Sequence, residues 1–173
     1  MDLAAHIRDI PDFPKPGILF KDITPLLLDP ESLRLAVREL ADWARPREVD
    51  FVVAAEARGF ILGGAVAREL GVGFVPARKP GKLPHDTVTA EYILEYGVDA
   101  LEMHADALAD GARVLLHDDL LATGGTAQAL AELIESAGAT IAGCAFLVEL
   151  AFLGGRDRLE GYDVHALLTY DGE

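Results

Sequence analysis

The stretch from Arg113 to Thr126 constrains the fold of this chain more than any other. It runs from an apolar segment, 114–116, through Asp118 and Asp119 into Thr123-Gly-Gly-Thr, and an apolar helical pattern follows. A short continuous apolar run is typical of a strand that is buried on both faces. A strand that ends at His117 and passes through a glycine turn into a helix therefore predicts an α/β fold with a parallel sheet.

Apolar runs and helical patterns alternate along the rest of the chain. Helical periodicity follows Asp29-Pro30 and ends at Pro46, a glycine-rich helical stretch covers 63–70, and a further helix ends at Gly138. We expect one parallel sheet flanked by helices and joined by right-handed crossovers. The strands predicted for it are 51–55, 74–76, 114–116, 141–150 and 164–168.

Two segments depart from this alternation. Residues 12–21 follow Pro11 and contain two more prolines and Gly17, which predicts an irregular segment lying over the sheet. Residues 87–96 are rich in Thr, Val, Tyr and Ile and favour an extended hairpin arm. No linker or internal repeat divides the sequence, so we expect 1–173 to form one domain.

The charge of the chain limits its partners. It has 15 Lys and Arg against 29 Asp and Glu, a formal charge of −14, which argues against binding nucleic acid. Its 51% apolar content excludes a disordered chain. A single cysteine and the lack of a signal peptide or long apolar run predict a cytoplasmic protein that does not enter membranes.

The residues after the predicted strand suit a sugar phosphate. Amide groups at a helix start lack partners within the helix, so a glycine turn there can surround a phosphate, and Thr123 and Thr126 add hydroxyl donors. Asp118 and Asp119 would repel that phosphate but can accept hydrogen bonds from ribose hydroxyls. The plainer interpretation is a solvated acidic turn before an ordinary helix cap. The sequence contains neither a P-loop nor a G-x-G-x-x-G motif, which disfavours other nucleotide loops.

The stretch 114–126 resembles the motif with which type I phosphoribosyltransferases bind 5-phosphoribosyl-1-pyrophosphate (PRPP). Five further segments in the same order narrow the resemblance to the adenine phosphoribosyltransferase family, and together they span nearly the whole chain. These segments are 12–25, 56–60, 78–84, 94–97 and 147–150. The resemblance implies the type I phosphoribosyltransferase fold with a small N-terminal hood, about 1–28, and a mobile β-arm lid, about 83–104. It also implies a homodimer.

The implied reaction is purine salvage, in which adenine and PRPP give AMP and pyrophosphate with Mg²⁺. By the resemblance, PRPP ribose and 5-phosphate lie against Asp118, Asp119 and the turn Ala122, Thr123, Gly124, Gly125 and Thr126. The cations at pyrophosphate positions are Arg58, Arg78, Lys79 and Lys82. Substrate oxygens and water would hold most of the Mg²⁺ shell, with Asp118 and Asp119 as possible ligands. The family's pyrophosphate loop also implies a cis peptide between Glu56 and Ala57.

The adenine site is implied at Leu19, Phe20 and Lys21. Phe20 would cover the purine, and the backbone N–H and C=O of Leu19 would pair with N1 and N6 of adenine. That pairing rejects a 6-oxopurine, because like hydrogen-bonding groups would then face each other. Lys21 stands where many relatives carry Arg, so it offers one point charge in place of a planar fork.

Glu95 is the expected catalytic residue. It lies in Leu-Glu-Tyr-Gly, 94–97, on the implied lid, and a carboxyl group there can manage proton transfer on the purine as N9 attacks C1′. Tyr96 is a candidate lid contact. Closure of the lid would exclude water that hydrolyses PRPP.

Two other functions fit parts of the same pattern. A 6-oxopurine phosphoribosyltransferase shares the PRPP motif and reads another purine edge, and a non-catalytic PRPP-sensing regulator keeps the site without turnover. The regulator would need a basic face or a DNA-binding module, which the acidic composition does not supply. Among the remaining residues, His117 is expected to be a neutral, hydrogen-bonded strand residue and Cys144 a small core residue. Trp43 fits core and interface equally.

Overall fold

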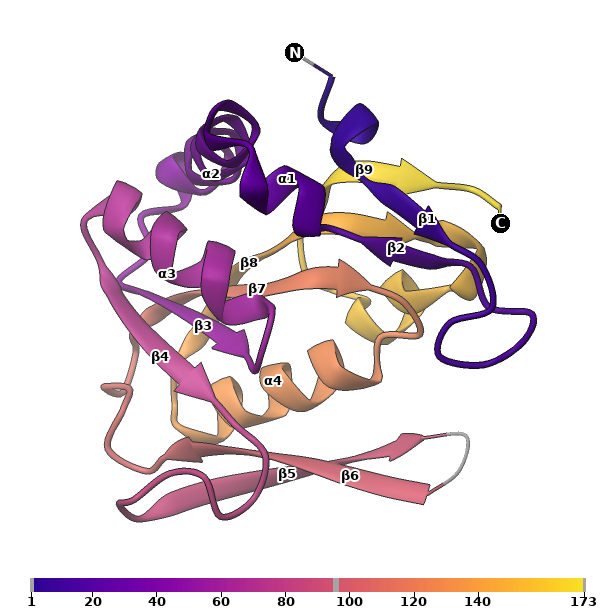
Figure 1. Cartoon of the computed structure of the whole chain (residues 1–173). Helices are drawn as coiled ribbons and strands as arrows, with labels where there is room; N and C mark the ends of the chain where they lie inside the picture. Colours follow the sequence, from indigo (N-terminus) through magenta and orange to yellow (C-terminus); the bar gives the residue numbers. More distant parts are fainter. Residues whose placement is uncertain (1, 95–96, 173) are drawn as a thin grey trace.

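The computed structural model describes residues 2–94 and 97–172, and Figure 1 shows a central sheet with helices on both faces. The sheet has the strand order β4-β3-β7-β8-β9, and each neighbouring pair runs parallel. The parallel sheet flanked by helices is therefore confirmed. Its strands are β3 (Phe51–Ala55), β4 (Gly73–Ala77), β7 (Arg113–Leu121), β8 (Thr140–Leu150) and β9 (Val164–Tyr170).

Two apolar clusters hold the helices to the sheet. On one face α2 (Pro30–Ala44) and α3 (Gly59–Leu70) pack through Leu40 and Leu62 against Leu115 of β7. On the other face α4 (Gly125–Ser136) packs through Leu130 against Phe146 of β8. Both faces of the sheet are covered, which explains why its strands read as continuous apolar runs.

Local signals account for the helix ends. The carboxylate of Asp29 accepts a 2.8 Å hydrogen bond from the Ser32 backbone N–H, and Pro30 occupies the first turn of α2. Gly71 ends α3 with φ +72°, a left-handed conformation that glycine adopts without strain. None of the described helices is both long and apolar enough to cross a membrane.

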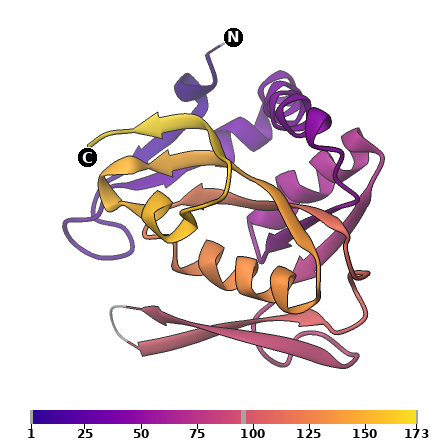
Figure 2. The ribbon, with the colours of Figure 1, turned by 180° about the vertical axis from the view of Figure 1, so that it is seen from behind.

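The hairpin arm exists as predicted and covers α4. Strands β5 (Thr87–Leu94) and β6 (Gly97–His104) pair antiparallel, and Figures 1 and 2 show them outside α4 from both sides of the molecule. Its base is tied to the sheet where Arg78 and Glu102 exchange two backbone hydrogen bonds of 2.9 and 2.7 Å. The arm is therefore attached next to the end of β4.

The N-terminal segment is more regular than the sequence indicated. Strands β1 (Arg8–Ile10) and β2 (Phe20–Asp22) form an antiparallel hairpin around the proline-rich residues 11–19, after the short helix η1 (Leu3–His6) and before α1 (Thr24–Leu28). The expectation of an irregular segment over all of 12–21 was wrong at its end. Pairing between Ile10 and Phe20 imposes strand structure that local composition does not reveal.

The strand before the acids is also longer than expected. It was predicted to end at His117, but β7 runs to Leu121, so Asp118 and Asp119 are strand residues. Asp118 pairs with Phe146 and Leu121 with Glu149 on β8. Acids are depleted in strands, and here the neighbouring strand overrides that local preference.

Candidate active site

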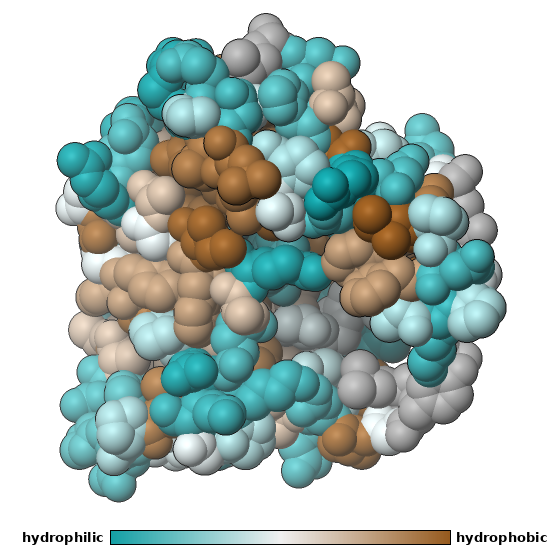
Figure 3. All heavy atoms as spheres, viewed as in Figure 1, coloured by the Kyte–Doolittle hydropathy of each residue, from teal (hydrophilic) through white to brown (hydrophobic). Residues whose placement is uncertain are grey.

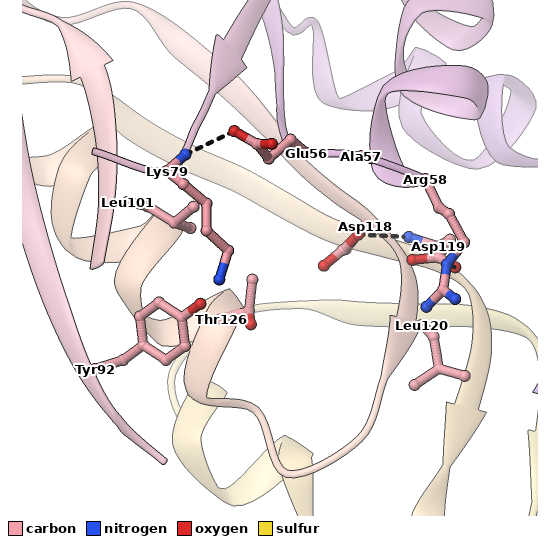
Figure 4. A pocket seen from close by; sticks show the side chains of 10 residues that line it. All are labelled: Glu56, Ala57, Arg58, Lys79, Tyr92, Leu101, Asp118, Asp119, Leu120 and Thr126. Carbon is pink, nitrogen blue, oxygen red and sulfur yellow. Dashed lines mark hydrogen bonds and ion pairs between the residues drawn. The ribbon is translucent and has the colours of Figure 1, made fainter. Parts of the chain in front are cut away.

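A cavity of about 450 Å³ opens at the carboxyl ends of β3, β4 and β7, the edge at which open α/β sheets bind ligands. Figure 4 shows the side chains that line it: Glu56, Ala57, Arg58, Lys79, Tyr92, Leu101, Asp118, Asp119, Leu120 and Thr126. A smaller cavity of about 80 Å³ lies over 120–127 and shares Tyr92, Leu120 and Thr126 with the first. The two adjoining cavities together form one site, which has a larger polar pocket and a narrow extension.

The narrow extension of the site is formed by the turn between β7 and α4. Gly124 has φ +86°, and α4 starts at Gly125 without any side-chain cap at its N-terminus. All five residues of the turn line the small cavity: Ala122, Thr123, Gly124, Gly125 and Thr126. An uncapped helix start surrounded by hydroxyl groups is suited to an anion. We call 122–126 the phosphate loop, after the group that the sequence resemblance leads us to expect there.

The two acids meet the large cavity in different environments. Asp118 points into the cavity, where its Oδ1 accepts a 2.9 Å hydrogen bond from the Asp119 backbone N–H (Figure 4). Burial, together with the charge of Asp119, raises the pKa of Asp118 well above its ordinary value. Gly59 at the start of α3 makes room for this carboxylate, since a Cβ there would lie 2.7 Å from Asp118 Oδ1. The interpretation of a solvated acidic turn was wrong.

Asp119 is 5% exposed and faces Arg58. Its Oδ2 lies 2.7 Å from Arg58 Nε, but the N–H is not aligned with that oxygen as a hydrogen bond, so the contact is an ion pair alone. Arg58 stands at the N-terminus of α3 and lines the same cavity. A cation and two acids thus share one pocket.

The other predicted cations reach the site to different degrees. Lys79 lines the cavity, its ammonium pairs with Asp99 of the arm, and its backbone N–H donates a 2.7 Å hydrogen bond to Glu56. Arg78 lies just outside and contacts Glu56 at 3.2 Å. Lys82 is exposed and does not line the cavity. The structure therefore brings together Arg58 and Lys79, with Arg78 beside them.

The peptide bond between Glu56 and Ala57 is cis, as the resemblance implied. Both residues line the large cavity, where the Glu56 carboxylate joins the loop after β3 to the loop after β4. The segment that the resemblance identifies as the pyrophosphate loop therefore forms part of the cavity wall.

Among the three candidate residues of the hood, Phe20 contacts Arg58 of the cavity wall, although its own side chain lines neither cavity. The guanidinium of Arg58 lies 5.1 Å from the Phe20 ring centroid, and Phe13 packs edge-on against the same ring. Leu19 is half-buried next to it. Lys21 points to the opposite face of β2, where its buried ammonium lies 2.7 Å from Asp9 Oδ1 and 4.2 Å from the Tyr170 ring. The structure does not bring the Lys21 side chain to the cavity.

Tyr92 and Asp99 are site residues that the sequence analysis missed. They face each other across the β5–β6 register, and the Tyr92 hydroxyl donates a 3.2 Å hydrogen bond to Asp99 Oδ2. Tyr92 lines both cavities, and burial raises its pKa. The cross-strand pairing of the predicted arm was the signal that could have found them. Glu95 and Tyr96 lie outside the described residues.

Three other residues lie where their chemistry predicts. His117 is fully buried, its Nδ1 lies 2.8 Å from the Ala145 carbonyl oxygen, and burial lowers its pKa to about 4. Since a carbonyl only accepts, the Nδ1–H donates, and His117 is the neutral strand residue expected. Cys144 is buried in the core. Trp43 is partly buried and stacks on His165.

Comparison with known proteins identifies the family. The phosphoribosyl transferase domain matches residues 27–166. Adenine phosphoribosyltransferase of Nitrosococcus oceani is 60% identical over 168 residues, 97% of this chain and 98% of that protein. The chain belongs to the adenine phosphoribosyltransferase family. It is therefore a transferase, and its sheet, flanking helices and hood have the type I phosphoribosyltransferase fold.

Solved structures of the family agree over the whole domain. Adenine phosphoribosyltransferase from Thermoanaerobacter pseudethanolicus superposes with a TM-score of 0.95 at 52% identity, covering 97% of this chain and 98% of that one. The enzyme from Saccharomyces cerevisiae, with D-2,5-dideoxy-2,5-imino-altritol 1,6-bisphosphate and adenine bound, gives a TM-score of 0.91 at 39% identity and covers 96% of each chain.

Proposed function

We propose that this chain transfers the 5-phosphoribosyl group of PRPP to adenine and releases AMP and pyrophosphate, as a purine salvage enzyme. The observation that carries this proposal is that the uncapped glycine turn of the phosphate loop and the acids Asp118 and Asp119 line two adjoining cavities, which share Tyr92, Leu120 and Thr126. The loop would hold the 5-phosphate, and the acids would accept hydrogen bonds from the ribose hydroxyls. The relatives' names and the adenine bound to the yeast enzyme support adenine as the base.

Arg58 and Lys79 are proposed to hold the pyrophosphate. Both line the large cavity, and the net charge of −14 makes such a local pair of cations necessary for a polyanion. Their fixed charges face the leaving group as negative charge grows on it, which stabilises the transition state in a site that excludes water. Arg78, joined to Glu56, is proposed to complete this wall. Lys82 is proposed as a pyrophosphate contact that approaches from outside the described pocket.

Phe20 is proposed to cover the purine ring. Its ring already carries the Arg58 guanidinium on one side, so the base and the pyrophosphate would be bound by adjoining groups. The half-buried Leu19 would supply backbone N–H and C=O groups to the purine edge, and this pairing selects adenine over a 6-oxopurine. Lys21 would act indirectly, by holding the hood hairpin through Asp9.

Glu95 is proposed to handle the proton that adenine loses as the new bond forms. The arm that carries Glu95 packs on α4 beside the phosphate loop, and its Tyr92 already lines the cavity. The variant Glu95→Gln is expected to lower kcat much more than PRPP affinity. Unchanged turnover would remove Glu95 from the catalytic residues. Movement of the arm as a lid is part of the same proposal.

Mg²⁺ fits the oxygen donors of this site. Asp118 and Asp119 line the cavity and are the carboxylates proposed to meet the ribose, and the described residues contain no cluster of three or more ligating side chains. Mg²⁺ prefers one or two carboxylates together with substrate oxygens and water, which matches this set. When bound, the ion would neutralise charge that develops on the pyrophosphate oxygens.

The chain is further proposed to be a cytoplasmic homodimer, without nucleic-acid or membrane partners. Figure 3 shows apolar side chains gathered over the α1 to α3 side, where Leu28 is 77% and Ile61 47% exposed. Such a patch suits association between copies. Light scattering coupled to size exclusion should give twice the chain mass.

One assay tests the proposed reaction. The purified chain with PRPP and Mg²⁺ should form AMP from adenine and no product from hypoxanthine, guanine or xanthine. Formation of IMP would indicate a 6-oxopurine enzyme, and PRPP binding without any turnover would indicate a regulator. Omission of Mg²⁺ should abolish AMP formation.

A further inference from the structure

We propose that the helix η4 (Gly155–Leu159) is the back wall of the phosphate loop, and that Gly155 is a positioning residue for PRPP binding. This inference rests on the proposed function, because it concerns the loop assigned there to the 5-phosphate. Nothing in η4 lines either cavity of the site, so its residues act through the loop.

The loop and η4 touch backbone to backbone. A Cβ on Gly155 would lie 2.4 Å from the Ala122 carbonyl oxygen and 3.0 Å from two atoms of the Leu121 side chain. A Cβ on Gly124 would lie 2.6 Å from the Gly155 carbonyl oxygen. The two glycines therefore let the chain segments approach more closely than any side chain permits, and backbone atoms cannot rotate away as a side chain can.

Three contacts prevent η4 from moving back. Arg156 donates two hydrogen bonds of 2.7 Å to the Glu149 carboxylate and a third of 2.8 Å to the Val164 carbonyl oxygen, so it joins η4 to β8 and β9. Leu159 is 1% exposed and belongs to the apolar cluster beneath α4. Arg158 donates a 3.0 Å hydrogen bond to Gln128 in the first turns of α4.

The contact between Arg156 and Glu149 attaches η4 to a buried part of the sheet. Glu149 is 3% exposed at the end of β8, where a carboxylate is costly to bury unless it is paired, and Arg156 meets both of its oxygens. Glu149 thus holds Arg156 in place, and the preceding residue, Gly155, touches Ala122 of the phosphate loop. The positions of the loop amides, which would bind the 5-phosphate, are thus set by a segment about 30 residues further along the chain.

Gly155→Ala tests the inference by placing one methyl group against the loop. The KM for PRPP is expected to rise at least tenfold, with KM for adenine and kcat at saturating PRPP within about twofold of wild type. Gly64→Ala is the matched control, because a Cβ there meets no atom within 4 Å and Gly64 lies within α3. Calorimetric titration with PRPP should show the same loss of affinity.

A second variant keeps the test valid if Gly155→Ala does not fold. Arg156→Lys retains the charge but loses the two-pronged contact with Glu149, and KM for PRPP should rise about threefold or more without a matching rise for adenine. Unchanged PRPP affinity in a folded Gly155→Ala protein would overturn the inference, as would equal losses in every kinetic constant. A wild-type chain that does not bind PRPP would overturn the proposed function as well.

Discussion

Arg58 lies between Asp119 of β7 and Phe20 of the hood and contacts both. Its Nε lies 2.7 Å from Asp119 Oδ2 at the end of β7, and its guanidinium lies 5.1 Å from the Phe20 ring of the hood. Asp119 is buried, so its charge is balanced mainly by this one cation. The proposed sugar site, pyrophosphate site and base site therefore depend on the position of a single side chain.

Arg58→Gln should weaken PRPP binding. A charge-assisted contact to a polyanion contributes about 1.5 to 3 kcal/mol, so we expect KM for PRPP to rise roughly 10-fold to 100-fold. Steady-state kinetics with varied PRPP at saturating adenine measure the change. Arg68→Gln, in the last turn of the same helix and away from the cavity, is the control. Equal effects of the two substitutions would show that Arg58 acts only through the charge of the helix.

The roles of Phe20 and Lys21 can be tested separately, although the two residues are adjacent in sequence. Phe20→Ala should raise KM for adenine roughly 5-fold to 100-fold, because stacking of a base on an aromatic ring contributes about 1 to 3 kcal/mol. Lys21→Met should leave KM for adenine within about twofold and instead lower the melting temperature, since the buried ammonium holds Asp9 and packs on Tyr170. A large rise in KM for adenine in Lys21→Met would contradict this assignment.

Local patterns in the sequence predict the elements around the site correctly. The apolar run, the acids and the glycine turn lie between Arg113 and Thr126, and their order alone predicted that a strand, a turn and a helix follow one another there. Tyr92 also lines the cavity, and Asp99 contacts both Tyr92 and Lys79 of the cavity wall. A pairing between two strands brings these two residues of the arm together. No pattern within either strand marks them, because residues elsewhere in the fold decide which face of the arm meets α4.

The contact between Gly155 and Ala122 is an even clearer case of a contact that local sequence patterns do not predict. Both residues lie in segments without periodicity, and their closeness depends on how β8 and η4 return to the loop. The length of β7 was missed for the same reason, since its pairing with β8 carries the strand through two acids that alone favour a turn. Lys21 shows the reverse case: the family resemblance implied a place for it in the base site, but strand alternation directs its side chain to the opposite face of β2.

Asp99 should hold the arm near the site. It pairs with the Lys79 ammonium, which raises the Lys79 pKa, and accepts the Tyr92 hydroxyl hydrogen bond. Both charged groups are partly exposed, so Asp99→Asn should have a small effect on global stability and increase amide exchange in β5 and β6 roughly twofold to fivefold. Hydrogen exchange read by mass spectrometry measures this. Asp106→Asn, which alters an exposed contact to His85 after the arm, should leave exchange unchanged.

His117 makes stability depend on pH. Burial lowers its pKa to about 4 from 6.5, so between these values the unfolded chain binds a proton that the folded chain does not. The free energy of unfolding therefore falls as the pH drops through this window, by roughly 3 kcal/mol from this group at its lower end. Its stabilising contribution is complete above pH 6.5.

His117→Leu should remove this dependence. The Nδ1–H bond to Ala145 would be lost, and so would the buried Nε2, which has no hydrogen-bond partner among the described residues. Urea unfolding at intervals between pH 4 and pH 7 should show a smaller slope of unfolding free energy against pH in the variant than in the wild type. Parallel slopes would mean that His117 titrates alike in the folded and unfolded chains, which would contradict a buried ring that stays neutral on folding.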